Sequence, residues 1–336
     1  MTSSRSRRFS LRILTALFAL TGIGMRAETC QTSTDMDEAT RTALNSAGQR
    51  YLDMIVRGDT ATLRQNAIPS VAADFSGIET TVKGHQSDLA RTKPTPRPSF
   101  LLDAPGTAVI PHAEFFCGVF GKTGQTANSA VFYLNNLPPG KYGVEIFDAN
   151  SAKTPVTVSL ILQQAGSDWK IGGLYIKSMQ LAGHDSAWFV PRAHEFKAKG
   201  ELHNAWLYYQ AAVSVISPLD FMSTAATDKL LDEAQAVKPT DFPVEGKTAD
   251  LIGPGTTYKL TAAYLQAVGD DLDLTVVHRV DDISNTNLTF QKNAGLMKAM
   301  LAKWPELKAG AAGINARAFD ASGRDYGTLL AMRDIK

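Results

Sequence analysis

The chain begins its folded part with the apolar spacing of helices. Within residues 35–57, apolar side chains recur every three or four positions and form one stripe along a helix. Gly58 is a suitable stop, and Asp59 is a suitable N-cap for a short second helix that Pro69 would end. A third helix is predicted over residues 76–90.

Between residues 99 and 178 the period changes to that of strands. Pro94, Pro96 and Pro98 precede this region and exclude a regular helix or a central strand there. Helices followed by a run of antiparallel strands predict an α+β domain, a cone of helices packed on one curved antiparallel sheet. The predicted strands cover residues 99–103, 114–120, 129–134, 142–148, 156–163 and 169–177.

The second half of the chain predicts a helical segment and then a small α+β domain. Two helices form a hairpin within residues 186–236, with one more helix at about 220–236. Residues 237–250 have the composition of a linker. A ββαββ domain is predicted over 251–336, with strands at 257–268, 272–280, 313–320 and 326–332 and a helix at 290–303.

Two features of the first half carry a resemblance to a known fold. They are the junction Arg57-Gly58-Asp59 between helices and the closing strand Asp168–Ile176, which has a Trp-Lys-Ile core. Residues 35–178 thereby resemble the nuclear-transport-factor-like superfamily, which includes SnoaL-like proteins and ketosteroid isomerases. This resemblance implies a cavity between the helices and the sheet. The turn at residues 137–142 also resembles that of transthyretin-like or carboxypeptidase-regulatory β-sandwiches, but the preceding helices disfavour a pure sandwich.

The helical segment carries a second resemblance. Small and aromatic residues over 187–218 follow the spacing of one tetratricopeptide hairpin: Phe189, Ala193, Phe196, Gly200, Ala205, Tyr209, Ala212 and Pro218. Because stable arrays of such units need about three or more repeats, an ordinary docked hairpin is an equal interpretation.

The N-terminus has the layout of a secretory signal peptide. Four arginines within residues 5–12 precede an apolar stretch over 13–25, and Ala27 is a small residue suited to cleavage. Residues 1–27 are therefore expected to direct a bacterial-type protein to the periplasm or medium through the Sec or twin-arginine route. No later stretch predicts a membrane span.

Charge and cysteine content narrow the picture further. The chain has 34 Lys and Arg against 33 Asp and Glu, and this net charge of +1 argues against nucleic-acid binding. The two cysteines, Cys30 and Cys117, are expected to form a disulfide in an oxidising compartment. The alternative is two free thiols, with Cys117 buried as a small apolar residue.

Familiar catalytic and metal motifs are missing from the sequence. The six histidines have no zinc spacing, and no Gly-x-Ser-x-Gly elbow occurs, so neither metal nor cofactor is predicted. Asp185 or Ser186 is better explained as a helix N-cap than as part of a triad. Residues 118–123 end like a phosphate-binding loop but are predicted to be a hairpin turn.

The cavity implied by the resemblance gives the candidate ligand-binding residues. If the strand faces that carry Tyr142, Asp148 and Tyr175 point inward, these side chains line a pocket, with Tyr133 and His112 as weaker candidates. The alternative is that the tyrosines are core or rim residues with satisfied hydroxyls.

Two classes of function remain open. The favoured hypothesis is a non-catalytic, exported module that binds a small apolar ligand or assembles with a partner protein, and a homodimer is compatible with it. The alternative is a small-molecule enzyme of the isomerase or dehydratase type, which needs a buried acid that faces a hydrogen-bond donor. A third, weaker hypothesis is peptide recognition by the helical hairpin.

Overall fold

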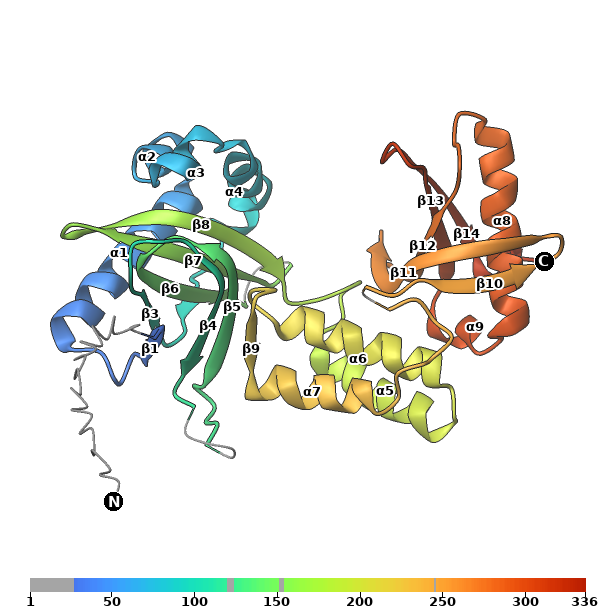
Figure 1. Cartoon of the computed structure of the whole chain (residues 1–336), viewed down its shortest axis with the longest axis horizontal. Coiled ribbons are helices and arrows are strands. Elements are labelled where there is room, and N and C mark those ends of the chain that lie inside the picture. The colour runs from blue at the N-terminus through green and yellow to red at the C-terminus, as the bar shows by residue number, and fades with distance from the viewer. Residues whose placement is uncertain (1–26, 120–123, 151–153, 245) are drawn as a thin grey trace, which may run out of the picture.

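The computed structural model describes residues 27–119, 124–150, 154–244 and 246–336. An N-terminal half of helices and strands and a C-terminal half with its own sheet lie on either side of the helices that follow residue 185 (Figure 1). The predicted signal peptide lies outside the described residues except for Ala27, and so does most of the turn predicted at 118–123. No helix of the described residues is long and apolar enough to cross a membrane.

The opening helices follow from their caps. The Asp37 side chain accepts from the backbone N–H of Thr40, and Gly58 ends the first helix with a φ of 71°, a left-handed conformation that glycine adopts without strain. Asp59 caps the second helix as expected. Pro69 does not end that helix but begins the next one, where its missing N–H costs nothing. The helices are α1 (Glu38–Arg57), α2 (Thr60–Gln65), α3 (Pro69–Ala73) and α4 (Ser76–Leu89).

The predicted strands of the N-terminal half belong to two sheets instead of one. The larger sheet runs in the antiparallel order β1-β3-β6-β7-β8, with the short β2 also paired to β6. Its strands are β1 (Thr29–Thr32), β2 (Thr95–Pro96), β3 (Phe100–Ala104), β6 (Gly140–Ala149), β7 (Val156–Ala165) and β8 (Asp168–Ser178). The smaller sheet contains β4 (Ile110–Cys117), β5 (Ala130–Leu137) and β9 (Met222–Thr224).

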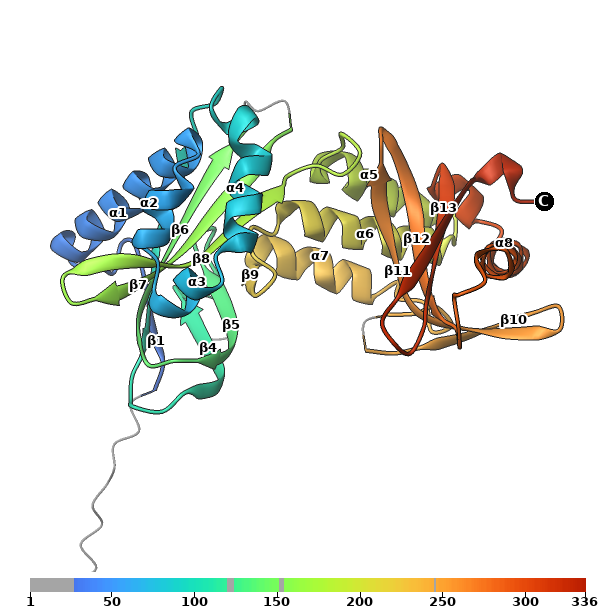
Figure 2. The same cartoon turned by 90° about the horizontal axis from the view of Figure 1, so that it is seen from above.

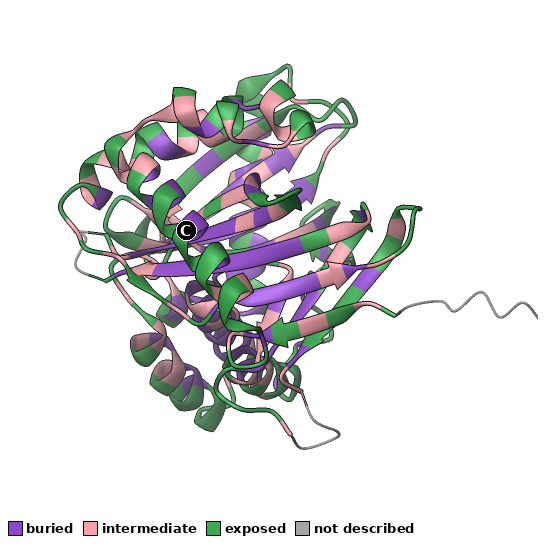
Figure 3. Ribbon diagram, turned by 90° about the vertical axis from the view of Figure 1, so that its left-hand side faces the viewer, coloured by how far each residue is buried: buried purple, intermediate pink, exposed green. Residues whose placement is uncertain are grey.

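The two sheets and the helices form three layers. Helices α1 and α4 pack on one face of the larger sheet, and the smaller sheet packs on its other face, so that two apolar cores enclose the central strands. Figure 3 shows the buried residues along these strands between the layers. Strand β6 is therefore buried on both faces over most of its length, whereas the predicted cone of helices on one curved sheet has no second sheet to cover its other face.

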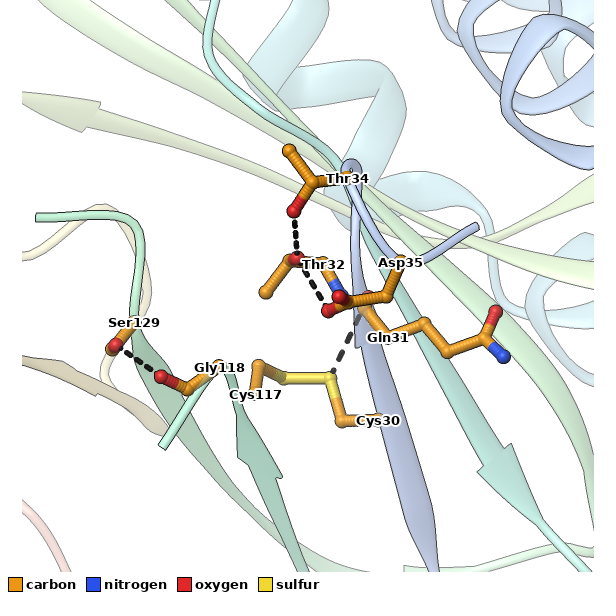
Figure 4. The surroundings of a disulfide bond; sticks show 8 residues. All are labelled: Cys30, Gln31, Thr32, Thr34, Asp35, Cys117, Gly118 and Ser129. Atoms are coloured by element: carbon orange, nitrogen blue, oxygen red, sulfur yellow. Dashed lines mark hydrogen bonds between the residues drawn. A yellow bond between two sulfur atoms is a disulfide. The ribbon is translucent and has the colours of Figure 1, made fainter. Parts of the chain in front are cut away.

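The disulfide predicted from the two cysteines is present. Cys30 of β1 bonds to Cys117 of β4, with their Cα atoms 4.9 Å apart and a separation of 87 positions in sequence (Figure 4). The bond joins the edge strand of the larger sheet to the smaller sheet. Beyond it, Thr32 donates from both its backbone and its hydroxyl to Asp35, which shapes the turn into α1.

The helical segment has the expected hairpin. The Asp185 side chain caps its first helix by accepting from the backbone N–H of Trp188, and Gly200 makes the turn between the two helices with a φ of 76°. The helices are α5 (Ser186–Ala198), α6 (Leu202–Ile216) and α7 (Ala225–Gln235), which lie together between the two halves (Figures 1 and 2).

The C-terminal sheet has one strand more than predicted. Its order is β10-β11-β12-β13-β14, and β12 and β13 are parallel, so the helix α8 between them is a crossover connection. The extra strand, β10, falls partly in the predicted linker. The elements are β10 (Ala249–Gly253), β11 (Thr256–Val268), β12 (Asp271–Arg279), α8 (Thr286–Lys303), α9 (Leu307–Gly310), β13 (Gly313–Phe319), β14 (Asp325–Ala331) and the 3-10 turn Met332–Asp334.

The helical segment and the C-terminal sheet share one apolar core. Side chains of α5, α6 and α7 pack with those of the sheet and of α8. The segment predicted as a linker contributes Val237, Phe242 and Val244 to this core, so it is buried structure there. These three side chains sit among polar turn residues, and this composition is why the segment had the pattern of a linker.

A buried polar network fixes α8 to this sheet. His278 Nε2 lies 2.6 Å from Asn293 Oδ1, and the Asn293 amide donates to carbonyls of β13 and β14 and to the hydroxyl of Thr328. Because the Asn293 oxygen accepts, His278 Nε2 carries the proton. His278 Nδ1 is then an acceptor without a partner among the described residues, and burial lowers the pKa of His278.

Candidate functional site

A cleft of about 900 Å³ lies between α1 and the strand edge formed by residues 96–99 and β6. One wall is a row of α1 side chains spaced four residues apart, which a helix brings onto one flank. The other wall comes from the proline-containing segment before β3. The lining residues are Ser33, Arg41, Asn45, Ser46, Gln49, Arg50, Asp53, Arg57, Pro96, Arg97, Pro98, Ser99, Glu145 and Phe147.

Glu145 is the buried acid of this cleft. It lies on β6 with 2% of its surface exposed, and its Oε1 has no hydrogen-bond partner among the described residues. Burial raises the pKa of the Glu145 carboxyl to about 7, and Ser99 opposes this only in part. With this pKa, both the protonated and the ionised form of Glu145 are populated near neutral pH.

Gly48 of α1 lies directly against Glu145. A Cβ at position 48 would stand 2.7 Å from Glu145 Cγ and 3.0 Å from Glu145 Oε2. A glycine inside a helix costs up to about 1 kcal/mol relative to alanine, so its presence needs a local reason. Here the missing side chain lets the helix pass over the carboxyl of Glu145.

Ser99 and Asn45 give the cleft an ordered polar pair. Ser99 Oγ lies 2.7 Å from Asn45 Oδ1 and donates its hydrogen to it. A serine hydroxyl has one hydrogen, so while Asn45 accepts it, Ser99 presents only lone pairs to Glu145. A hydrogen bond donated by Ser99 to Glu145 lowers the pKa of this carboxyl, so Ser99 opposes the effect of burial only when its hydroxyl turns from Asn45 to Glu145.

The charged groups around this carboxyl are mostly arginines. Arg41 donates to the carbonyl of Ser33 at 3.1 Å, and the guanidinium of Arg50 lies 4.9 Å from the centre of the Tyr51 ring. Arg41, Arg50 and Arg57 form no ion pair with any residue in the described ranges.

Two acids reduce the positive charge of the cleft only partly. Arg97 is bound to Asp148, with its nitrogens 2.8–3.0 Å from the carboxylate oxygens. Asp53 accepts from Gln49 at 2.8 Å. The cleft thus keeps an excess of unpaired positive charge above a buried, protonatable carboxyl.

The structure does not bring the five candidate residues from the sequence into this cleft. Tyr142 faces the smaller sheet and donates to the carbonyl of Pro138 at 2.7 Å, which is the satisfied core tyrosine of the alternative interpretation. Asp148 is held by Arg97 beside the cleft but does not line it. Tyr133 and His112 are exposed on the outer side of β5 and β4.

Tyr175 is displaced from the helix-facing side by an irregularity in β8. Leu162 pairs with Ile171 and Ile161 pairs with Gly173, so Gly172 is an extra residue between them. Trp169 and Ile171 therefore face the helices, whereas Tyr175 faces away and packs on Phe221 with ring centres 5.4 Å apart. Tyr175 is 42% exposed.

Glu145 was not predicted as a site residue because the sequence analysis assigned the opposite face of β6 to the cavity. Tyr142, Val144 and Ile146 belong to the core against the smaller sheet, whereas Glu145 and Phe147 face the helices. Two signals in the sequence could have found the site. One is an acid inside an otherwise apolar strand, and the other is Gly48 inside a helix with no turn nearby.

No group of three or more potential metal-binding side chains occurs among the described residues. Comparison with known proteins gives no assignment: no family model, no curated protein and no solved structure matches this chain.

Proposed function

We propose that this protein is an exported ligand-binding module that holds a small organic anion in the cleft between α1 and β6. The three arginines of α1 that line the cleft and form no ion pair in the described residues, Arg41, Arg50 and Arg57, carry this proposal. Arginine guanidinium groups bind carboxylates through paired, charge-assisted hydrogen bonds. The polar lining favours such an anion over the small apolar ligand expected from the sequence.

The rest of the proposal concerns fold and compartment. Helices packed on one face of an antiparallel sheet support the resemblance to the nuclear-transport-factor-like superfamily, while the second sheet is an addition that the resemblance does not imply. The disulfide is compatible with an oxidising compartment, and the N-terminal pattern supports export. The tetratricopeptide resemblance of the helical hairpin and a homodimer stay predictions.

The test is calorimetric titration of the mature protein with succinate, with succinamide as a neutral molecule of the same skeleton. We expect succinate to bind and succinamide to bind far more weakly. Replacing Arg41 and Arg50 together by glutamine should weaken succinate binding about tenfold or more, since each charge-assisted hydrogen bond contributes about 1.5–3 kcal/mol. Arg333→Gln, an exposed arginine in the C-terminal half, is the matched control. Equal affinity for both molecules, or equal loss in the control, would contradict the proposal.

A second candidate function is acid–base catalysis by Glu145. The observation that favours it is a buried carboxyl beside an open cleft, with a pKa raised to about 7. Such a group could remove and return a proton at carbon next to a carbonyl. The test is exchange of the C3 hydrogens of 2-oxoglutarate in heavy water, followed by NMR. Acceleration by the wild type and not by Glu145→Gln would support catalysis, and equal rates would leave binding alone.

A further inference from the structure

Glu145 occupies an unusual position for an acid beside several arginines. Its Oε1 is without a partner, and no ion pair joins its carboxylate to a basic residue of the described ranges. Burial raises the pKa of Glu145, a hydrogen bond from Ser99 lowers it in part, and no arginine contributes. The arginines thus line the open cleft, and Glu145 lies beneath it with no arginine paired to its carboxylate.

The charged groups around Glu145 come from three parts of the chain. Helix α1 supplies three cations and one acid, and the segment between β2 and β3 supplies one further cation, which Asp148 of β6 neutralises. Strand β7 presents Leu160 beside Glu145 and adds no charge there. The groups are Arg41, Arg50, Asp53 and Arg57 of α1, and Arg97 with its partner Asp148.

An anion in the cleft would change what Glu145 can do. An ionised Glu145 would place a second negative charge beside the ligand, on a carboxyl that is itself shielded from water, which is costly. A protonated Glu145 removes that repulsion and offers an O–H donor to an oxygen of the ligand. Its unpartnered Oε1 is the atom that can carry this proton.

We infer that the cleft takes up an organic anion together with one proton, which Glu145 holds. This inference rests on the proposed function and adds to it a dependence on pH. No covalent bond forms or breaks: the proton moves from solvent to a carboxylate oxygen of Glu145 when the anion binds, and it returns to solvent on release. The site thus captures the anion on the acidic side of neutrality and releases it on the alkaline side.

The experiment is calorimetric titration with succinate, which itself does not titrate between about pH 7 and 8.5. Measurement in two buffers of different ionisation enthalpy gives the number of protons taken up. At about pH 8 we expect close to one proton per bound succinate, and a Kd that rises up to about tenfold per pH unit above Glu145's titration. Asp53→Asn, which removes the exposed acid of the same cleft, should keep this uptake.

Glu145→Gln should bind succinate with no proton uptake and with little change of Kd over the same range. As a readout that needs no variant, infrared difference spectra of the wild type at about pH 8 should show a new protonated carboxyl band when succinate is added. Binding by the wild type without proton uptake and without this band would overturn the inference while the proposed function stands. Absence of succinate binding at every pH would overturn the proposed function itself.

Discussion

Replacing Glu145 by glutamine is expected to stabilise the N-terminal half relative to the wild type as the pH rises. In the folded protein, burial raises the pKa of Glu145 from 4.5 to about 7. The folded state therefore binds the proton more tightly than the unfolded state. The contribution of this group to stability is fully present below about pH 4.5 and is lost as the pH rises through about 7. Glutamine has nearly the same shape and carries no charge, so it does not show this loss.

The size of the effect follows from the two pKa values. A difference between 4.5 and about 7, at about 1.4 kcal/mol for each pKa unit, corresponds to roughly 3 kcal/mol at pH 8. Any cost of the amide itself is independent of pH. The quantity to compare is therefore the stability difference between variant and wild type at about pH 8, minus the same difference at about pH 4.5.

The assay is urea unfolding followed by hydrogen-exchange labelling of peptides from β6 and β7, which reports on the N-terminal half alone. Glu114→Gln, an exposed glutamate on β4, is the matched control and should show almost no change with pH. A pH-independent difference for Glu145→Gln would refute the reasoning. A difference of the opposite sign would show that Glu145 is ionised and paired in the folded protein.

Three further predictions concern packing, covalent structure and acid stability. Gly48→Ala should lower the free energy of unfolding by about 1–3 kcal/mol because its Cβ would meet Glu145 at 2.7 Å, whereas Gly84→Ala in α4, which has open space, should raise it by up to about 1 kcal/mol. Reduction of the disulfide between β1 and β4 should cost about 4.6 kcal/mol in chain entropy, seen as a lower urea midpoint for the N-terminal half and little change in the C-terminal half. Lowering the pH below 6.5 should destabilise the C-terminal half, since burial lowers the pKa of His278 and the unfolded state binds its proton first. Faster hydrogen exchange in α8 should report this loss of stability. Asn293→Ala, which removes the hydrogen-bond partner of His278, should lower the stability of the C-terminal half by about 2 kcal/mol already at neutral pH.

The success of the sequence-based predictions varied with how local each feature is. The caps at Asp59 and Asp185 and the stop at Gly58 depend on neighbouring residues, and they were predicted correctly from the sequence. The disulfide between Cys30 and Cys117 was also predicted correctly, because the chain has no other cysteine to pair. The α+β class followed from the order of helical and strand periods.

The candidate site could not be located in the same way. Alternation distinguishes the two faces of a strand only when one of them is exposed, and β6 is buried on both. In β8, the extra residue Gly172 reverses the alternation partway along the strand. Tyr175 therefore points to the opposite face of the sheet from Trp169.

Sequence by itself determined most helices and strands, two of the helix caps and the cysteine pair, because hydrogen bonds and periodicity within a short stretch decide most of them. Tertiary structure alone decided that the strands divide into two sheets, that Glu145 lies beneath α1, and that the arginines of α1 stay unpaired above it. The physical reason is that the state of an acid depends on which surfaces exclude water from it. Those surfaces come from segments about a hundred residues apart in this chain, such as Gly48 and Glu145.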